Sequence, residues 1–340
     1  MKESEEKKES GNNANGLLQV RNLVKHYPVR GGVFSRKLAS VKAVQDVSFV
    51  LHEGETLGLV GESGCGKSTL ARTVIRLEDP TSGSVLFKGR DLAKLNSKEL
   101  FSVRRDIQMI FQDPYSSLNP RMTVGDIVMD PLKVHRMGNR KQREEKAADL
   151  LERVGLSADL TSRYPHEFSG GQRQRIGVAR ALSLEPKVII ADEPVSALDV
   201  SVQSQVLNLL MSLQMDFGLT YLFITHDLSV VKHICDRIAV MYLGRIVEQG
   251  SAEEIFKKSR HPYTRFLMEA APAPDPKKMR IKRLIRGETP SPITPPPGCA
   301  FHPRCPYAIP ECKKGVPPLA GVDSEKSSEH LCACIRKNEI

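Results

Sequence analysis

The chain has no tryptophan, and aromatic residues make up only 5% of its 340 residues. Base-stacking platforms are therefore scarce, which disfavours nucleic acid as a partner. The longest uninterrupted apolar runs, such as 188–191 and 221–224, fall far short of the 18 or more residues that a membrane-spanning helix needs. Residues 1–16 lack the apolar segment of a secretory signal, so we expect a soluble cytosolic protein.

The charge balance is basic, with 50 Lys and Arg against 40 Asp and Glu and a formal net charge of +10. Such a balance suits nucleic acid, an anionic membrane surface or phosphate ligands, and does not choose among them. Hydrophobic residues make up 40% of the chain, which is enough for a large buried core and excludes wholesale disorder.

Proline divides the chain into a front part and a tail. Fourteen of the 22 prolines lie between Pro262 and Pro318, so the front three-quarters is expected to fold as one unit. The predicted segments are a disordered tail at 1–16, a folded domain at 17–257, a proline-rich and basic linker at 258–297, and a small cysteine-rich C-terminal module at 298–340.

Strand and helix patterns alternate within the front part. Short runs rich in β-branched and aromatic residues predict buried strands of a parallel sheet at 56–60, 107–111, 188–191 and 220–224. Helical patterns lie between them, at about 67–77, 141–154, 171–184 and 200–216. This alternation predicts an α/β fold. Two further segments favour antiparallel strands, at 41–50 and at 237–247 with a turn at Leu243-Gly244.

A glycine-rich segment follows the first predicted strand and precedes a helix. It reads Gly61-Glu-Ser-Gly-Cys-Gly-Lys67-Ser68-Thr69 and matches G-x4-G-K-[ST]. Glycines let the backbone wrap closely round phosphates, Lys67 reaches the β- and γ-phosphate oxygens, and Ser68 holds Mg²⁺. The predicted ATP-binding residues of this loop are Gly61, Glu62, Ser63, Gly64, Cys65, Gly66, Lys67, Ser68 and Thr69.

Two carboxylates, Asp192 and Glu193, follow the predicted strand at 188–191. Ligands bind at the carboxyl edge of a parallel sheet, so Asp192 is placed to hold Mg²⁺ and Glu193 to polarise an attacking water. His226 follows the strand at 220–224 and is expected at the same edge as a phosphate contact. With the glycine-rich segment, these residues predict phosphoryl transfer.

A second anion-binding helix start lies upstream of the acidic strand, in Phe168-Ser169-Gly170-Gly171-Gln172-Arg-Gln-Arg175. The phosphate loop of the chain does not need this second anion-binding site, which suggests that the site contacts a nucleotide bound by a partner chain. Here the sequence resembles the ATP-binding-cassette (ABC) ATPases, whose signature motif reads LSGGQ, with Phe168 replacing the usual Leu. The resemblance implies that a partner's nucleotide is contacted by Ser169, Gly170, Gly171 and Gln172.

The same resemblance implies roles for other residues. Gln112 matches the Q-loop glutamine, Ser196 and Asp199 belong to a segment like the D-loop, and His226 matches the switch histidine. Tyr27 resembles the aromatic residue that stacks on adenine. The family implies hydrolysis of ATP to ADP and phosphate, with catalytic residues Glu193, His226 and Gln112 and with Mg²⁺ held by Ser68, Gln112 and Asp192.

The implied fold is an ABC-type P-loop ATPase core at 17–257, with an antiparallel β subdomain and a helical signature subdomain at about 113–178. Three further stretches resemble the oligopeptide and dipeptide importers, at 111–120, 164–169 and 298–306. The long segment between Tyr27 and Val41 is similar to the F-type rather than the D-type ATPase subunit of these systems.

The importer resemblance implies a D-type ATPase as heterodimer partner, two membrane permease subunits and an extracytoplasmic substrate-binding protein. The chain would then attach peripherally to the cytoplasmic face of the membrane, with its permease contacts at about 113–165. Importers of nickel or oligosaccharides stay open as alternatives. A non-transport ABC ATPase is disfavoured, because the chain has one cassette and no long heptad run.

The tail carries two unassigned features. Residues 277–286 hold six basic and no acidic residues, which fits a solvated charged segment or attraction to an anionic membrane leaflet. Five of the seven cysteines lie in the last 42 residues, and in a cytosolic chain bound metal is a more natural interpretation than disulfides. Their spacings lack the C-x2-C pairs of structural zinc sites, whereas four thiolates suit an iron–sulfur cluster.

The family resemblance implies a [4Fe–4S] cluster on four of these cysteines, with Zn²⁺ as the alternative. Cys332 is then a neighbour rather than a ligand. Nothing in the sequence places the thiols near the ATP site, so we expect a structural or docking role for them. The implied ligands are Cys299, Cys305, Cys312 and Cys334.

Overall fold

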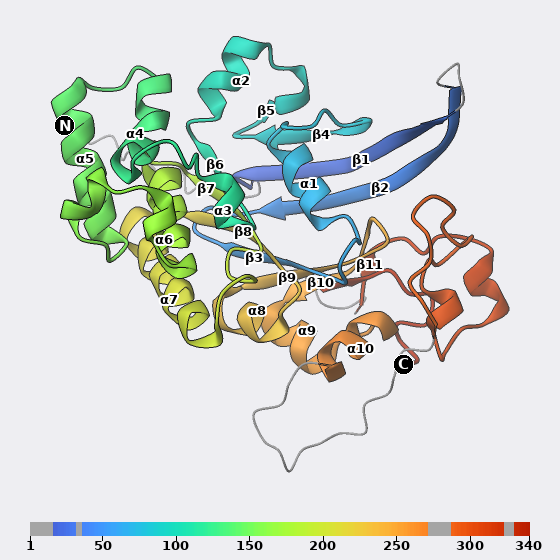
Figure 1. The fold of residues 1–340 in the computed structure, drawn as a ribbon. Coiled ribbons are helices and arrows are strands. Elements are labelled where there is room, and N and C mark those ends of the chain that lie inside the picture. The colour runs from blue at the N-terminus through green and yellow to red at the C-terminus, as the bar shows by residue number, and fades with distance from the viewer. Residues whose placement is uncertain (1–15, 32–35, 271–286, 323–329) are drawn as a thin grey trace, which may run out of the picture.

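The computed structural model describes residues 16–31, 36–270, 287–322 and 330–340. Its central element is an eight-stranded sheet in the order β11-β12-β10-β9-β3-β8-β7-β6 (Figure 1). The strands from β9 to β6 pair in parallel, whereas β10, β12 and β11 pair antiparallel. Their bounds are β3 Thr56–Val60, β6 Ile107–Ile110, β7 Val188–Asp192, β8 Thr220–Thr225, β9 Arg237–Tyr242, β10 Arg245–Ser251, β11 Ala320–Gly321 and β12 Leu331–Cys332.

A second, antiparallel sheet has the order β2-β1-β4-β5. Its strands are β1 Leu18–Gly31, β2 Arg36–Leu51, β4 Ser82–Phe87 and β5 Arg90–Asp91. Apolar side chains of this sheet, such as Leu18 and Phe49, share one buried cluster with Leu59 of β3 and with Leu70 of helix α1 (Lys67–Val74). Burial of these side chains fixes α1, and the loop before it, between the two sheets.

The remaining helices flank the central sheet. Figure 1 shows α4 to α7 at the opposite end of the molecule from the C-terminal segments. A second buried cluster joins these helices to the sheet, through residues such as Leu151, Ile176 and Phe223. The bounds are α2 Ser97–Val103, α3 Pro114–Ser117, α4 Val124–Val134, α5 Arg140–Arg153, α6 Gly170–Leu182, α7 Val200–Phe217, α8 Leu228–Ile234, α9 Ala252–Lys258 and α10 Pro262–Ala270, with short 3₁₀ turns η1 Leu92–Lys94, η2 Ala158–Ser162, η3 Pro165–Glu167, η5 His302–Arg304 and η6 Pro310–Lys313.

Side chains of the sequence fix several helix starts. The Asn139 side chain accepts from the backbone N–H of Gln142, and the Gln142 side chain accepts from that of Asn139, which makes a capping box for α5. Ser169 and Gln172 cap α6 in the same way. Such boxes satisfy backbone N–H groups that a helix start otherwise leaves without partners.

The predicted strands and helices of the front part are confirmed with small shifts at their ends. The hairpin with a turn at Leu243-Gly244 is also confirmed, as β9 and β10. One pairing differs from the expectation, because β9 also runs parallel to β3, with Gly58 opposite Ile238. The hairpin therefore continues the parallel sheet and does not belong to the antiparallel one.

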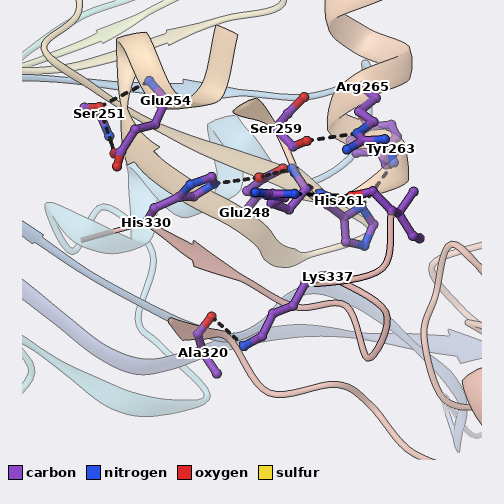
Figure 2. Close-up of polar contacts among 12 residues, drawn as sticks. Glu248, Ser251, Glu254, Ser259, His261, Tyr263, Arg265, Ala320, His330 and Lys337 are labelled. Carbon is purple, nitrogen blue, oxygen red and sulfur yellow. Dashed lines mark hydrogen bonds and ion pairs between the residues drawn. The ribbon is translucent and has the colours of Figure 1, made fainter. Parts of the chain in front are cut away.

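The C-terminal segments complete the central sheet. β12 pairs with β10, where Cys332 lies opposite Glu248. Figure 2 shows His330 directed at the fully buried Glu248, and its Nε2 lies 2.7 Å from Oε1 of that carboxylate. Glu248 also accepts from the backbone N–H groups of Arg260 and His261, at 2.6 and 3.0 Å. The end of the chain is thus tied to the strand that follows the hairpin turn.

No helix among the described residues is long and apolar enough to cross a membrane. Two features expected from the sequence lie outside the described residues: nearly all of the tail at 1–16, and the basic segment at 277–286.

Candidate active site

The phosphate loop lies between β3 and α1, and its glycines are required by close backbone contacts. Gly66 has a φ of 110°, and a Cβ there would lie 2.1 Å from the carbonyl oxygen of Ala43. A Cβ on Gly61 would lie 2.2 Å from the carbonyl oxygen of Met241. Only glycine tolerates both the conformation at Gly66 and these approaches.

Lys67 is buried at the start of α1. Its ammonium donates to the carbonyl oxygens of Gly61 at 2.8 Å and Glu62 at 3.1 Å, so the loop curls round the charge. The helix N-terminus adds backbone N–H groups and a partial positive charge at the same place. This arrangement suits the phosphates of a nucleotide.

Ser68 and Asp192 meet beneath the loop, as the sequence predicted. The Ser68 hydroxyl donates to Oδ1 of Asp192 at 3.0 Å. Burial raises the pKa of the Asp192 carboxyl, and the hydrogen bond from Ser68 opposes that shift. A hydroxyl and a buried carboxylate are hard oxygen ligands, and Mg²⁺ usually takes one or two such groups together with substrate phosphates. The residues present therefore fit Mg²⁺.

The predicted catalytic residues converge on the Glu193 carboxylate. Gln112 donates from Nε2 to Oε2 of Glu193 at 2.9 Å, and Nδ1 of His226 lies 3.2 Å from Oε1. Glu193 has a φ of 47°, which is strained for a residue other than glycine, and its backbone N–H donates to the carbonyl of Ile224. The turn after β7 thus aims this carboxylate at the edge of the sheet.

These groups line one cavity of about 810 Å³, within the range of small-ligand sites. All nine residues of the phosphate loop contribute to it, together with Gln112, Glu193 and His226. Several further residues line the cavity that the sequence did not predict: Val41, Lys42 and Ala43 of β2, Leu228 of α8, Leu243 and Gly244 of the hairpin turn, Leu267 of α10, and Pro292.

Tyr27 also lines the cavity, from β1. Its hydroxyl donates to Glu78, and the Lys25 ammonium lies 4.9 Å from the centre of its ring. Burial and the bond to Glu78 raise the pKa of the Tyr27 phenol. The ring is therefore fixed at the wall of the cavity.

The signature segment lies away from this cavity. Ser169 is exposed at the start of α6, and none of the four predicted signature residues lines the cavity. A Cβ on Gly171 would lie 2.4 Å from the Val202 side chain of α7, which explains why a glycine occupies this position. Ser196 and Asp199 are exposed beside α7, and the Ser196 hydroxyl donates to the carbonyl of Glu193 at 3.1 Å.

Four thiols of the C-terminal segments line a second pocket, and they are the four predicted from the sequence: Cys299, Cys305, Cys312 and Cys334. Burial raises the pKa of Cys299 to about 11 and raises those of Cys305 and Cys334, and neighbouring thiols add to each shift. Within the described parts of the chain, no three His, Cys, Asp or Glu residues are grouped to hold one metal ion.

The C-terminal segments also contact the phosphate loop, which the sequence did not indicate. Arg304, one residue before Cys305, donates to both carboxylate oxygens of Glu62 in the phosphate loop, at 3.0 and 3.2 Å. No local pattern in the sequence marks this contact, because 242 residues separate its two partners.

Two family models match the sequence. The model described as "ABC transporter" matches residues 44–196, and "Oligopeptide/dipeptide transporter, C-terminal region" matches residues 247–312.

Curated relatives match over most of their length. The "Probable peptide ABC transporter ATP-binding protein y4tS" of Sinorhizobium fredii is 58% identical over 90% of this chain and 87% of the relative. The "Oligopeptide transport ATP-binding protein AppF" of Bacillus subtilis is 53% identical over 95% of this chain and 98% of the relative.

Solved structures of ATP-binding cassettes share the fold. The dimeric post-hydrolysis state of the cassette MJ0796 bound to ADP and Pi has a TM-score of 0.62 and 30% identity, over 69% of this chain and 98% of that one. The structure of cbiO1 from Clostridium perfringens, part of the ABC transporter complex cbiONQ, has a TM-score of 0.61 and 29% identity, over 72% and 91% of the two chains.

Proposed function

This chain belongs to the ATP-binding proteins of peptide and oligopeptide ABC transporters, and on that premise we propose that it hydrolyses ATP to drive peptide import. It is an ABC ATPase that binds ATP at the phosphate loop and releases ADP and phosphate. The observation that carries the assignment is the convergence of Gln112, Glu193 and His226 at the cavity that the phosphate loop lines.

In this proposal Glu193 accepts the proton of the attacking water. Gln112 and His226 hold its carboxylate at 2.9 and 3.2 Å, which orients the base before the substrate arrives. Lys67 and the N-terminus of α1 bind the β- and γ-phosphates. These positive groups are in place before the reaction and stabilise the negative charge that develops on the phosphate oxygens during transfer.

Ser68, Gln112 and Asp192 are the proposed ligands of Mg²⁺. The ion supplies Lewis-acid neutralisation of the phosphate oxygens when it is bound. Tyr27 is proposed to stack on the adenine ring, which agrees with its fixed position at the cavity wall.

We further propose that a second ATPase subunit, of the D type, completes the site. The signature residues at 169–172, of which Ser169 is exposed, would contact the partner's nucleotide, because they lie outside the cavity of their own chain. Support comes from the cassette MJ0796, which is described as dimeric. Ser196 and Asp199 would lie at the same interface.

Coupling to two permease subunits is proposed for residues 113–165, with peptide delivered by an extracytoplasmic binding protein. This segment follows Gln112 and exposes apolar side chains, including Tyr115 at 61% and Val134 at 54%. The chain would dock peripherally on the cytoplasmic face of the membrane. The proposed organisation keeps the nucleotide-binding domain at 17–257, its helical subdomain at about 113–178, and the C-terminal module at 298–340.

Uptake of a labelled peptide into proteoliposomes tests this function. Vesicles that contain the permeases, both ATPase subunits, the binding protein and internal ATP are expected to accumulate peptide. Vesicles without this chain are expected to accumulate none, because the partner alone lacks a complementary site. Equal uptake with and without the chain would contradict the proposal.

A second proposal concerns the thiol pocket. We infer that Cys299, Cys305, Cys312 and Cys334 hold a [4Fe–4S] cluster, with Zn²⁺ as the competitor. Support comes from the shared pocket and from the absence of Cys332 among its lining residues. Four thiolates suit an iron–sulfur cluster, and their spacings in the sequence lack the C-x2-C pairs of structural zinc sites. A cluster would stabilise a segment that has little apolar core of its own.

Anaerobically purified full-length protein is therefore expected to be brown, with broad absorbance at ~400 nm and about four irons per chain. Cys334→Ser should lose the colour, whereas Cys332→Ser, a change two residues away, should keep it. Colourless protein with one zinc would reject the cluster, and protein without metal would reject both metals.

A further inference from the structure

The contact between Arg304 and Glu62 is bidentate. Nη1 of Arg304 donates to Oε2 of Glu62 at 3.0 Å, and Nη2 donates to Oε1 at 3.2 Å. Paired bonds of this kind are stronger and more directional than a single charge-assisted bond. The Arg304 side chain is only 8% exposed, so water screens the pair less than a surface ion pair.

Glu62 is held by other C-terminal groups as well. The Thr289 hydroxyl donates to its Oε2 at 2.9 Å, and its backbone N–H donates to the hydroxyl of Tyr263 in α10 at 2.9 Å. On its other side, the Glu62 carbonyl accepts from Lys67 at 3.1 Å. Glu62 therefore connects the C-terminal segments to the lysine of the phosphate loop.

The turn that carries Arg304 is itself anchored in the core. Phe301 is 1% exposed, and its ring centre lies 5.3 and 5.4 Å from those of Tyr242 and Tyr263. The Arg304 backbone N–H donates to the Phe301 carbonyl at 2.9 Å, and the Cys299 N–H donates to the Cys312 carbonyl at 2.8 Å. The guanidinium is thus presented from a fixed turn.

We propose that Arg304 is a positioning residue of the nucleotide site, which holds and neutralises the Glu62 carboxylate so that the phosphate loop keeps the shape and charge that bind ATP. The inference rests on the proposed function, because it assumes that ATP binds at this loop. Glu62 lines the cavity, and a carboxylate there repels the triphosphate unless a cation pairs with it. Through Arg304, the conformation of residues 299–305 then influences nucleotide affinity.

Equilibrium binding of MgATP to the full chain tests the proposal. Arg304→Gln should raise the Kd about tenfold, because it leaves a partly buried carboxylate without its cation. Arg304→Lys should raise the Kd less, since an ammonium keeps the charge but not the paired bonds. The matched control is Lys314→Gln, which removes a cation from the same segment at an exposed pair with Glu311.

A double substitution separates this role from a merely structural one. In a Glu62→Gln background, Arg304→Gln should change the Kd by less than about threefold, because the charge that Arg304 neutralises is already gone. A Kd for Arg304→Gln within about twofold of the wild-type value, or full additivity of the two changes, would overturn the proposal.

Hydrogen–deuterium exchange on the wild-type chain gives a test that does not depend on how a variant folds. Saturating nucleotide should slow exchange at residues 299–305, because coupling between two sites is reciprocal. Unchanged exchange there would overturn the proposal. A wild-type chain that binds no nucleotide at all would instead refute the proposed function.

Discussion

Glu193→Gln should lower ATP hydrolysis by about 100-fold or more and leave ATP binding intact. The amide has the shape of the carboxylate but is not basic enough to take a proton from water. Gln112 can still donate to the remaining carbonyl oxygen at position 193, so the geometry of the edge should survive. Phosphate release and equilibrium ATP binding, measured on the same preparation of the assembled transporter, separate the two effects.

Glu253→Gln is the matched control, because it makes the same change at an exposed residue of α9, outside the proposed permease contacts, whose partner Lys257 lies 2.7 Å away. It should leave hydrolysis unchanged. A fall of less than about tenfold for Glu193→Gln, or about 1.4 kcal/mol of barrier, would exclude Glu193 as the general base.

Lys67→Ala should behave differently and weaken ATP binding itself, because it removes the buried charge that faces the phosphates.

Ser169→Arg should reduce hydrolysis by the assembled transporter about 100-fold, while the isolated chain keeps its ATP affinity. The residue is exposed at the start of α6 and does not line the cavity of its own chain. A long cationic side chain there would block the partner's phosphates from the helix N-terminus. Hydrolysis by the complex and ATP binding by the isolated chain are the two measurements.

Ser251→Ala controls for the loss of a capping serine. Ser251 lies outside the proposed permease contacts and caps α9 with the same kind of capping box, by accepting from the backbone N–H of Glu254. The control should retain hydrolysis within about twofold, since losing a cap costs only about 1 kcal/mol of stability. Weaker ATP binding by the isolated Ser169→Arg chain would mean that the signature segment contributes to the ATP site of its own chain. It would then contradict the proposal that this segment contacts the partner's nucleotide.

The central strands could be predicted because each is a short run of mainly apolar residues. All five residues of β3 are buried, as are all six of β8, and such runs are typical of a sheet covered on both faces. The phosphate loop and the acidic turn could be placed for the same reason, since both directly follow these runs. Their convergence at one edge is a property of parallel strands.

The rest of the site depends on contacts between distant parts of the chain. Pro292 lines the cavity beside β2, where the Lys42 backbone N–H donates to its carbonyl at 3.1 Å, and no local pattern encodes that bond. The parallel pairing of β9 with β3 was missed because its hairpin with β10 dominates the local pattern. Arg304 was missed because it lies among cysteines and prolines that suggested a separate module.

The measurement that tests the central claim most directly is steady-state phosphate release by the purified chain alone and in complex with the D-type subunit and the permeases. The account predicts slow release by the chain alone and a rate at least about tenfold higher in the complex, because the catalytic edge needs a signature helix from a partner. Full activity in a strictly monomeric preparation would contradict it.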